Sequence, residues 1–476
     1  MKRAAYMLLR GSAPADGGSM NKKIWLGLAV VIVAAAAFIL NAVPKGSEWT
    51  TSSPEARAEF TAAVDAQMKL YRGDVRAHLE RALELDPDFV MAKLSLADQL
   101  KMDDDGQSAG LWNDVMSADQ SKLSERERVY INRARAMQEK RYADADEMLD
   151  TYLADHPNDP FLLHQKALAL WMTGEFEEAE KLNRRLIEIA PNWVIAYNQL
   201  GYIAMSQGRF AEAEEYFTSY RFVAPDQANP HDSLAELYIM IGRYEEAENS
   251  LYRSIAIKPD FWNAYDHLAM TMMMVSDFVG AEEALAMAEE AGDVPEYWKN
   301  GIGCIIRIEE LAHNEQYREI LALKEEEPEC FKGHSEGHGS VTAHRAASLL
   351  GEWEIAEAIE NDFAVIIEKM KDSGDERDES DVAGALAHLQ GVRLAVQGDL
   401  EGAIERFKVA DHNMTYIQAG NGLFKLYNRL FLVETLFASG MDGKAHKVLS
   451  KVRSVNPRLV EDFEEHGLKI LGLERE

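Results

Sequence analysis

The most regular part of the chain is a pattern of small and aromatic positions that repeats at a constant interval between Lys140 and Asp293. Alanines recur at this interval, at Ala145, Ala179, Ala213, Ala247 and Ala281. An aromatic residue stands three positions before each alanine, at Tyr142, Phe176, Phe210, Tyr244 and Phe278. A proline follows twelve positions after the first four alanines, at Pro157, Pro191, Pro225 and Pro259. A repeat of about 34 residues accommodates two short helices and two turns, so the pattern predicts a row of helical hairpins.

Two further sets of positions support helical hairpins. Glycines stand five positions before three of the alanines, at Gly174, Gly208 and Gly242, where they permit the left-handed turn that ends a first helix. Small residues recur ten positions after the proline column, at Ala167, Gly201, Ala235, Ala269 and Gly303. They let the two helices of a hairpin approach closely. Because proline cannot continue a helix, we expect each second helix to stop at the proline column.

These positions resemble the tetratricopeptide-repeat (TPR) family. The stretch GRYEEAENSLYRSIAIKPD at 242–260 follows the second-helix pattern of that family closely. The resemblance implies an all-α fold, an α-solenoid of helix-turn-helix repeats with a concave groove. Members of the family use this groove mostly to hold peptides or helices of partner proteins, but the resemblance does not identify the partner.

Less regular units extend the pattern in both directions. Ser53, Pro54 and Glu55 predict the start of a first helix, with a hydroxyl cap, a proline in the first turn and a carboxylate at the positive helix end. We therefore expect a solenoid over 54–370, most regular over 124–293, and further repeats with a capping helix at 458–472 in a C-terminal part over 382–476. Two interruptions are predicted: a glycine–histidine loop at 333–340 and a mobile charged linker at 371–381, which has no hydrophobic residue.

An apolar run near the N-terminus predicts a membrane anchor. At about 1.5 Å per residue, a helix over 24–43 just spans a hydrocarbon core. Residues 1–23 are basic and 44–53 form a short polar linker. The positive-inside rule then places residues 1–23 in the cytoplasm and the body outside it, in the periplasm if the cell is Gram-negative. A cleaved signal peptide is the alternative, although Leu40 stands where a small residue is needed, and Met20 is an alternative start of the chain.

The charge of the chain narrows the class of partner. A formal net charge of −31 repels nucleic acid and anionic lipid surfaces and favours basic partners. The same charge would also keep a long solenoid soluble, with no partner implied. The two cysteines, Cys304 and Cys330, are too few for a disulfide framework, although they could pair in an oxidising compartment.

The resemblance implies that the first helix of each unit lines the concave groove, and the inward positions recur at the same interval as the alanines. The predicted groove residues are Phe161, Ile195, Asn229 and Asn263; His164, Asn198, Asp232 and Asp266; Leu168, Tyr202, Glu236 and Met270; and Trp171, Met205, Ile239 and Met273. This stripe is aromatic at one end, acidic in the middle and methionine-rich at the other end. It lacks the lysines with which some family members clamp a C-terminal carboxylate. We expect it to bind a segment with basic and apolar residues, unless several of its members only pack between units.

Two clusters suggest metal binding as an alternative. His334, His338 and His344, with Glu336 and Cys330 nearby, offer ligands for a transition metal but match no tight zinc spacing. The second cluster is His267 with Met270, Met272, Met273 and Met274, which could bind copper(I) or simply fill a helical core.

No catalytic signature appears: the chain lacks GxSxG, HExxH and GxxxxGK[ST] motifs. We therefore predict a protein without catalytic activity and without a cofactor. The function that the sequence favours is a membrane-anchored scaffold or adaptor of bacterial type, which binds a segment of a partner protein and no nucleic acid. An extracytoplasmic metal-binding protein, using either 334–344 or 270–274, is the alternative.

Overall fold

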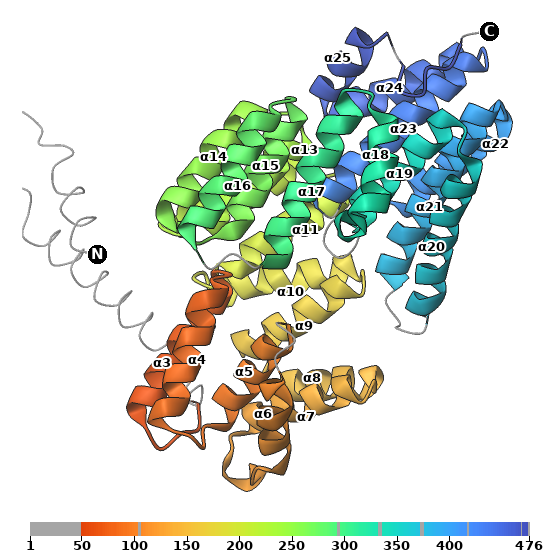
Figure 1. Cartoon of the computed structure of the whole chain (residues 1–476). Helices are drawn as coiled ribbons and strands as arrows, with labels where there is room; N and C mark the ends of the chain where they lie inside the picture. The colour runs from red at the N-terminus through yellow and green to blue at the C-terminus, as the bar shows by residue number, and fades with distance from the viewer. Residues whose placement is uncertain are drawn as a thin grey trace, which may run out of the picture.

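The computed structural model describes residues 49–102, 106–292, 296–331, 336–371, 376–416, 418–467 and 469–474. These parts of the chain form 23 α-helices and two short 3₁₀ helices, and they contain no strand. Successive helices pair into antiparallel hairpins that stack side by side (Figure 1). The predicted all-α fold is confirmed.

The N-terminal hairpins are α3 (Pro54–Met68) with α4 (Arg72–Leu85), α5 (Val90–Met102) with α6 (Gln107–Ser117), and α7 (Glu125–Gln138) with α8 (Tyr142–Asp155). The central hairpins are α9 (Pro160–Met172) with α10 (Phe176–Ile189), α11 (Ile195–Ser206) with α12 (Phe210–Val223), α13 (Asn229–Met240) with α14 (Tyr244–Ile257), and α15 (Trp262–Met274) with α16 (Phe278–Ala291). The C-terminal hairpins are α17 (Glu296–His313) with α18 (Tyr317–Glu326), α19 (Glu336–Leu350) with α20 (Trp353–Lys371), α21 (Glu376–Gln397) with α22 (Leu400–Asn413), and α23 (Ala419–Ala438) with α24 (Asp442–Val455). The last helix is α25 (Pro457–Glu465), and the 3₁₀ helices are η1 (Gln120–Lys122) and η2 (Pro328–Phe331).

The repeating sequence pattern coincides with the hairpins. Helices α8, α10, α12, α14 and α16 each begin at the repeated aromatic residue, and the five repeated alanines are fully buried. α8, α10, α12 and α14 each end two residues before the repeated proline. Gly208 and Gly242 have φ angles of 72° and 78°, in the left-handed region that the turn requires. The sequence therefore predicts these helix boundaries correctly.

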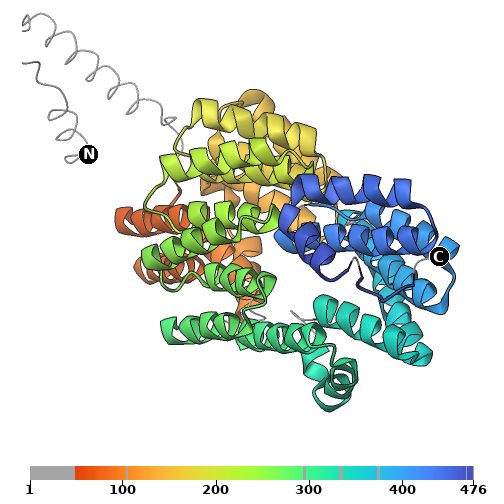
Figure 2. The same ribbon diagram turned by 90° about the horizontal axis from the view of Figure 1, so that it is seen from above.

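The row of hairpins curls, so that helices far apart in the sequence lie together. Seen from above, the helices surround a common centre, and the C-terminal helices in blue lie beside the central ones in green (Figure 2). At the N-terminal end, the Ala228 N–H group donates a hydrogen bond of 2.9 Å to the Tyr71 hydroxyl, and Lys258 forms a 3.1 Å ion pair with Asp74. At the C-terminal end, α23 packs against α13. Helix α13 is consequently buried over almost its whole length.

Three segments differ from the sequence-based expectations. The predicted glycine–histidine loop at 333–340 is partly helical, because α19 begins at Glu336. The predicted charged linker at 371–381 is also partly helical, since α20 reaches Lys371 and α21 begins at Glu376. Helices α19 and α21 bury apolar residues further along the chain. This packing stabilises each helix and extends it over part of the preceding polar segment.

The predicted capping helix at 458–472 is shorter than expected. Helix α25 ends at Glu465, and Gly467 has a φ of 69°. Beyond it, the N–H groups of Ile470 and Leu471 donate hydrogen bonds of 2.6 and 2.8 Å to the Glu434 carboxylate. This buried carboxylate accepts hydrogen bonds from backbone N–H groups of the last residues. These groups therefore have partners although the helix does not continue.

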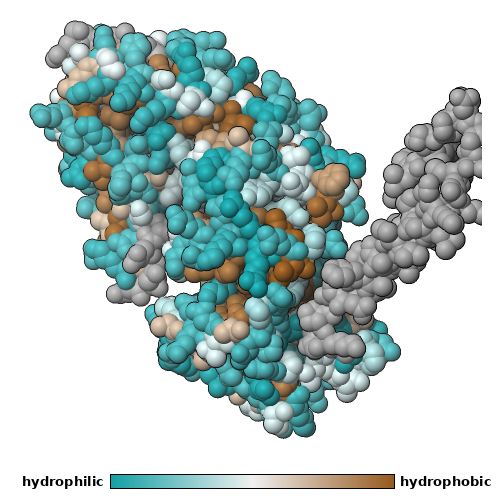
Figure 3. All heavy atoms as spheres, turned by 180° about the vertical axis from the view of Figure 1, so that it is seen from behind, coloured by the Kyte–Doolittle hydropathy of each residue, from teal (hydrophilic) through white to brown (hydrophobic). Residues whose placement is uncertain are grey.

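Residues 1–48, which include the predicted anchor at 24–43, lie outside the described residues. None of the helices within 49–474 that the structure describes combines the length and the apolar character needed to cross a bilayer. The two cysteines form a disulfide, Cys304–Cys330, which ties α17 to η2. One face of the molecule is mostly hydrophilic, with hydrophobic residues gathered in separate patches (Figure 3).

Candidate partner-binding groove

The predicted groove residues lie, as expected, on the first helices of four consecutive hairpins, α9, α11, α13 and α15. Nine of them are buried: Phe161, His164, Ile195, Asn198, Met205, Asn229, Asp232, Glu236 and Ile239. Seven are half-buried: Leu168, Trp171, Tyr202, Asn263, Asp266, Met270 and Met273. None is fully exposed, so other parts of the same chain cover much of the stripe. Their role in binding a partner remains a prediction.

The segment before α3 covers the aromatic end of the stripe. The Trp49 ring lies edge-on to Phe161, with a centroid separation of 5.1 Å. The Arg126 guanidinium stacks over Trp49 at 4.1 Å, a favourable cation–π arrangement. Thr50 donates two hydrogen bonds to the Glu127 carboxylate, from its N–H group at 2.6 Å and from its hydroxyl at 2.5 Å. Glu127 stands one repeat interval before Phe161 and therefore occupies the same groove position in the preceding unit.

The centre of the stripe is a buried network of charged and hydrogen-bonded groups. His267 Nδ1 lies 2.8 Å from Asp232 Oδ1, and the Tyr202 hydroxyl donates a hydrogen bond of 2.5 Å to Glu236 Oε2. Burial lowers the pKa of His267, but the carboxylates of Asp232, Glu236 and Asp266 outweigh burial and raise it to about 10. His267 is therefore protonated at neutral pH. Its positive charge balances part of the acidic charge of the groove, which the sequence-based prediction had matched with a basic partner.

Sequence reasoning placed His267 in a methionine-rich metal cluster and missed this role. A signal was available, because His267 directly follows Asp266 in the acidic column and could reach the carboxylates of the preceding unit. Burial and the Glu236 charge also raise the pKa of Tyr202, so its hydroxyl stays a hydrogen-bond donor.

The start of α23 fills the groove next to this network. Glu236 Oε1 accepts a hydrogen bond of 2.8 Å from the N–H group of Ala419, the first residue of α23. Gly422 lies so close to Met240 that an added Cβ would stand 2.5 Å from the Met240 sulfur. Helix α13 thus holds a helix of its own chain.

A second contact fixes the same C-terminal hairpin to the end of α13. Asn456 Nδ2 donates to the Met240 carbonyl at 3.2 Å and lies 3.3 Å from the Tyr244 hydroxyl. Asn456 Oδ1 in turn accepts from the Leu459 N–H group at 3.2 Å and caps α25. Because Asn456 is fully buried, each of these polar contacts replaces water that the groups have lost.

The methionine end of the stripe remains accessible. On α15, Asn263, Asp266, Met270 and Met273 are half-buried, and Leu268 and Ala269 between them are buried against the neighbouring helices. Methionine side chains adapt their shape to irregular apolar surfaces. A carboxylate, an amide and two methionines together can recognise a segment with apolar and basic or donor groups.

Three residues of the predicted histidine cluster, Cys330, His338 and His344, have other partners. The sulfur of Cys330 is bonded to Cys304 and is not a free thiolate. His338 pairs with Glu309 at 2.9 Å, and His344 pairs with Glu360 at 3.0 Å. Wherever the structure describes the chain, no group of three histidine, cysteine or acidic side chains is arranged to hold a metal ion. His334 lies outside the described residues.

The Glu309–His338 pair is partly exposed, since 48% of the His338 side chain and 31% of the Glu309 side chain are accessible to solvent. Burial raises the pKa of Glu309, but His338, Arg345 and a hydrogen bond of 3.0 Å from the Thr342 hydroxyl lower it to about 2. The Glu309 charge correspondingly raises the pKa of His338. This pair joins α17 to α19 across adjacent units, which is a structural role.

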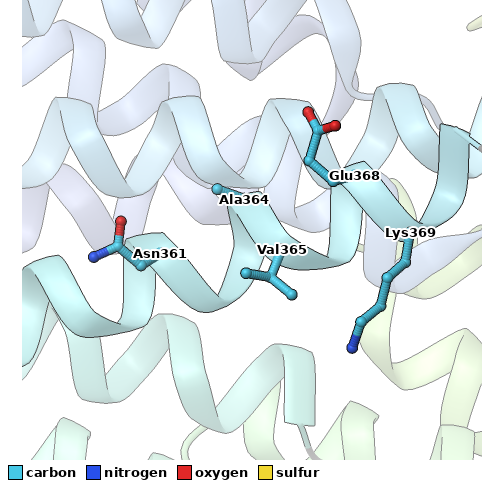
Figure 4. A pocket seen from close by; sticks show the side chains of 5 residues that line it. All are labelled: Asn361, Ala364, Val365, Glu368 and Lys369. Carbon is cyan, nitrogen blue, oxygen red and sulfur yellow. The ribbon is translucent and has the colours of Figure 1, made fainter.

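Two surface hollows lie elsewhere on the described residues. One hollow lies along α20 and is lined by Asn361, Ala364, Val365, Glu368 and Lys369. All five side chains come from this one helix and point in different directions (Figure 4). A second hollow runs along α10, between Glu177 and Glu188. Neither contains a predicted groove residue.

Two family models described as tetratricopeptide repeat match the chain, over residues 136–201 and 196–260. Among solved structures, the type IV pilus biogenesis factor PilW is 19% identical, covers 46% of this chain and 98% of its own, and gives a TM-score of 0.36. A tetratricopeptide repeat protein from Parabacteroides merdae is 19% identical over 58% of this chain and 98% of its own, with a TM-score of 0.39. The APC/C hetero-tetramer Cut9–Hcn1 is 14% identical over 93% of this chain and 82% of its own, with a TM-score of 0.45. No curated protein matches the chain.

At these identities and scores, the similar structures say nothing about a partner or a role. The two family models, however, cover α8 to α14, where the second helices begin and end as the repeating pattern predicts. Residues 136–260 are therefore tetratricopeptide repeats.

Proposed function

We propose that this protein is a non-catalytic scaffold, tethered to a membrane, that holds a helical or extended segment of a partner protein in its concave groove. Proteins built of tetratricopeptide repeats serve as scaffolds for protein–protein interaction. The kind of partner, the membrane tether and binding of the partner in the groove are what we propose for this protein.

The observation that carries this proposal is the accessible methionine end of the groove. Met270 and Met273 on α15 are half-buried beside Asp266, which gives apolar area next to a carboxylate. Apolar anchors supply most of the affinity at such surfaces, and charged groups contribute mainly to orientation and to the association rate. A partner segment with apolar and basic residues suits this surface, because the chain has a net charge of −31.

Site-specific photo-crosslinking in intact membranes tests the groove. A photoreactive amino acid in place of Met270 should capture one protein reproducibly. The matched control is the same amino acid in place of Glu282, an exposed residue of the second helix of the same hairpin, α16. Identical capture from both positions, or none from Met270, would refute binding in the groove.

The location outside the cytoplasm has two supports. The apolar run at 24–43 follows a basic N-terminus. The body also contains the Cys304–Cys330 disulfide, and disulfides persist mainly in oxidising compartments.

Thiol labelling of whole cells tests the location. A maleimide that adds mass to free thiols should modify the denatured protein only after reduction. Protease added to spheroplasts should digest the body while leaving a membrane-bound N-terminal fragment. Free thiols in freshly lysed cells together with full protection from protease would place the body in the cytoplasm.

A further inference from the structure

The start of α23 lies in the concave groove as a bound segment would. Ala419 is fully buried, and its N–H group donates to Glu236 although the two residues are 183 positions apart. Helices α13 and α23 are not neighbours in the row of hairpins. They meet only because the array curls, so the contact is a docking of one part of the repeat array onto the groove of another.

The chemistry of this contact suits the beginning of a helix. The first N–H groups of a helix lack partners within the helix, and this end carries partial positive charge. Glu236 provides a carboxylate for it, and the Tyr202 hydroxyl holds the other carboxylate oxygen at 2.5 Å. The Tyr202 hydroxyl therefore helps to orient the carboxylate that accepts from Ala419.

Three residues further along, Gly422 leaves room for a side chain only if Met240 moves. A Cβ at Gly422 would lie 2.5 Å from the Met240 sulfur and 3.1 Å from the Tyr416 ring. Gly420, in the same first turn, is exposed, and a Cβ there would meet nothing within 4 Å. A side chain would therefore meet the wall of the groove at Gly422 but point into open space at Gly420, two positions earlier.

An aromatic residue anchors the approach to the helix. The Tyr416 ring packs edge-on against Phe210 with a centroid separation of 5.4 Å. Edge-to-face aromatic pairs contribute specific geometry as well as buried area. The three contacts therefore fall on Tyr416, Ala419 and Gly422, at regular intervals of three positions.

We propose that Tyr416, Ala419 and Gly422 form an internal ligand of the groove, and that the partner segment carries the same pattern. This segment has an aromatic residue, a small residue three positions later that begins a helix, and a glycine after three more. The inference rests on the proposed function of the groove. Internal and external segments compete for Glu236 and Met240, so a partner gains this part of the groove only when the start of α23 leaves it.

A labelled synthetic peptide with the sequence of residues 414–432 is the probe, titrated against the full chain in detergent. The test variant is Gly422→Leu, which places a side chain against Met240 and displaces the internal segment. The matched control is Gly420→Leu, which adds the same side chain two positions away in open space. A second peptide carries the Gly422→Leu change itself.

The Gly422→Leu chain should bind the unmodified peptide at least tenfold more tightly than the parent chain, and Gly420→Leu should bind like the parent. The modified peptide should bind to neither variant. Hydrogen exchange should show release of the start of α23 in Gly422→Leu and unchanged protection of α9–α12. If Gly422→Leu does not fold, Asn456→Ala opens the same hairpin without added bulk, because it removes the hydrogen bonds to Met240 and Tyr244.

If a chain with a released α23 start binds the peptide no better than the parent, the C-terminal hairpin closes the array for structural reasons only and the inference is refuted. This outcome is distinguishable from failure of the proposed function. A partner that crosslinks at Met270 in the parent and in Gly422→Leu to the same extent refutes the inference alone, whereas absence of that crosslink refutes the groove as a binding site.

Discussion

Replacing Gly201 by alanine should destabilise the protein, although the same change stabilises most helices. Gly201 lies inside α11 and is buried. An added Cβ would stand 2.3 Å from Cε1 of Phe217, whose side chain is fully buried. Ordinary contact begins at 3.4 Å, so the ring or the helix has to move by about 1 Å.

The magnitude follows from two opposing effects. Alanine is favoured over glycine inside a helix by about 1 kcal/mol. Overpacking of a well-packed core costs about 1–3 kcal/mol, and the value here should lie toward the upper end because Phe217 is enclosed on all sides. We expect Gly201→Ala to lower the free energy of unfolding by about 1–2 kcal/mol.

The chain supplies both a control and a replicate. Gly110 lies inside α6, is exposed, and would place a Cβ in open space. Gly110→Ala should therefore raise the free energy of unfolding by about 0.5–1 kcal/mol. Gly391, inside α21, faces Phe407 as Gly201 faces Phe217, with a Cβ distance of 2.7 Å, and its alanine variant should also destabilise.

Urea unfolding followed by far-ultraviolet circular dichroism gives the stabilities. Repeat arrays can unfold in parts, so hydrogen exchange of α11 and α12 should locate the loss. The reasoning about close helix packing fails if Gly201→Ala is as stable as the parent while Gly110→Ala shows its expected gain.

Three further outcomes are expected. Burial lowers the pKa of His164 to about 4, so the free energy of unfolding should fall by about 3 kcal/mol as the pH drops from 6.5 toward 4 and the buried imidazole becomes protonated. The melting temperature of His164→Gln should therefore depend less on acid pH than that of the parent. The same acid dependence in both proteins would contradict this. Replacing Cys304 and Cys330 by serine removes a cross-link between residues 26 positions apart and should cost about 3 kcal/mol, measured by unfolding with and without reductant; equal stability of both forms would rule this out. Ser124→Ala, which removes the capping hydrogen bond to the Glu127 N–H group, should cost about 1 kcal/mol, and Glu127→Ala should cost more because Glu127 also holds Thr50; the reverse order in urea unfolding would disprove the second role.

Local rules were sufficient for the repeats themselves. The aromatic, alanine and proline columns predict where α8, α10, α12 and α14 begin and end, because helix starts, helix stops and close packing depend on residues within one unit. The resemblance to the tetratricopeptide-repeat family, and not the columns, implies that the first helix of each unit lines the groove; the period then gives the positions of its inward residues.

The curl of the array could not be predicted in this way. It accumulates from small rotations between hairpins, and no single residue specifies it. Nothing in the sequence pattern therefore indicates that Glu236 meets Ala419 or that Tyr71 meets Ala228. For the same reason, the pattern presents Asp232 and Glu236 as open to a partner, whereas both side chains are buried.

The less regular segments were mispredicted for a different reason. At 333–340 and 371–381 the composition favours loops, but α19 and α21 each bury an apolar face further along and extend over part of the polar stretch. Tertiary packing outweighed local propensity at these two positions.

The contact between α13 and α23 also limits how this protein can change in length during evolution. In an open array, duplication of one hairpin lengthens the protein without disturbing distant units, because each unit touches only its neighbours. Here four hairpins, from α15 to α22, separate Glu236 from Ala419. A duplicated hairpin among them would carry Ala419 and Asn456 past α13 and leave Glu236 and Met240, in the C-terminal half of that helix, without their partners. We therefore expect relatives of this protein to keep the number of repeats between these helices constant and to gain or lose repeats only before α3 or after α25.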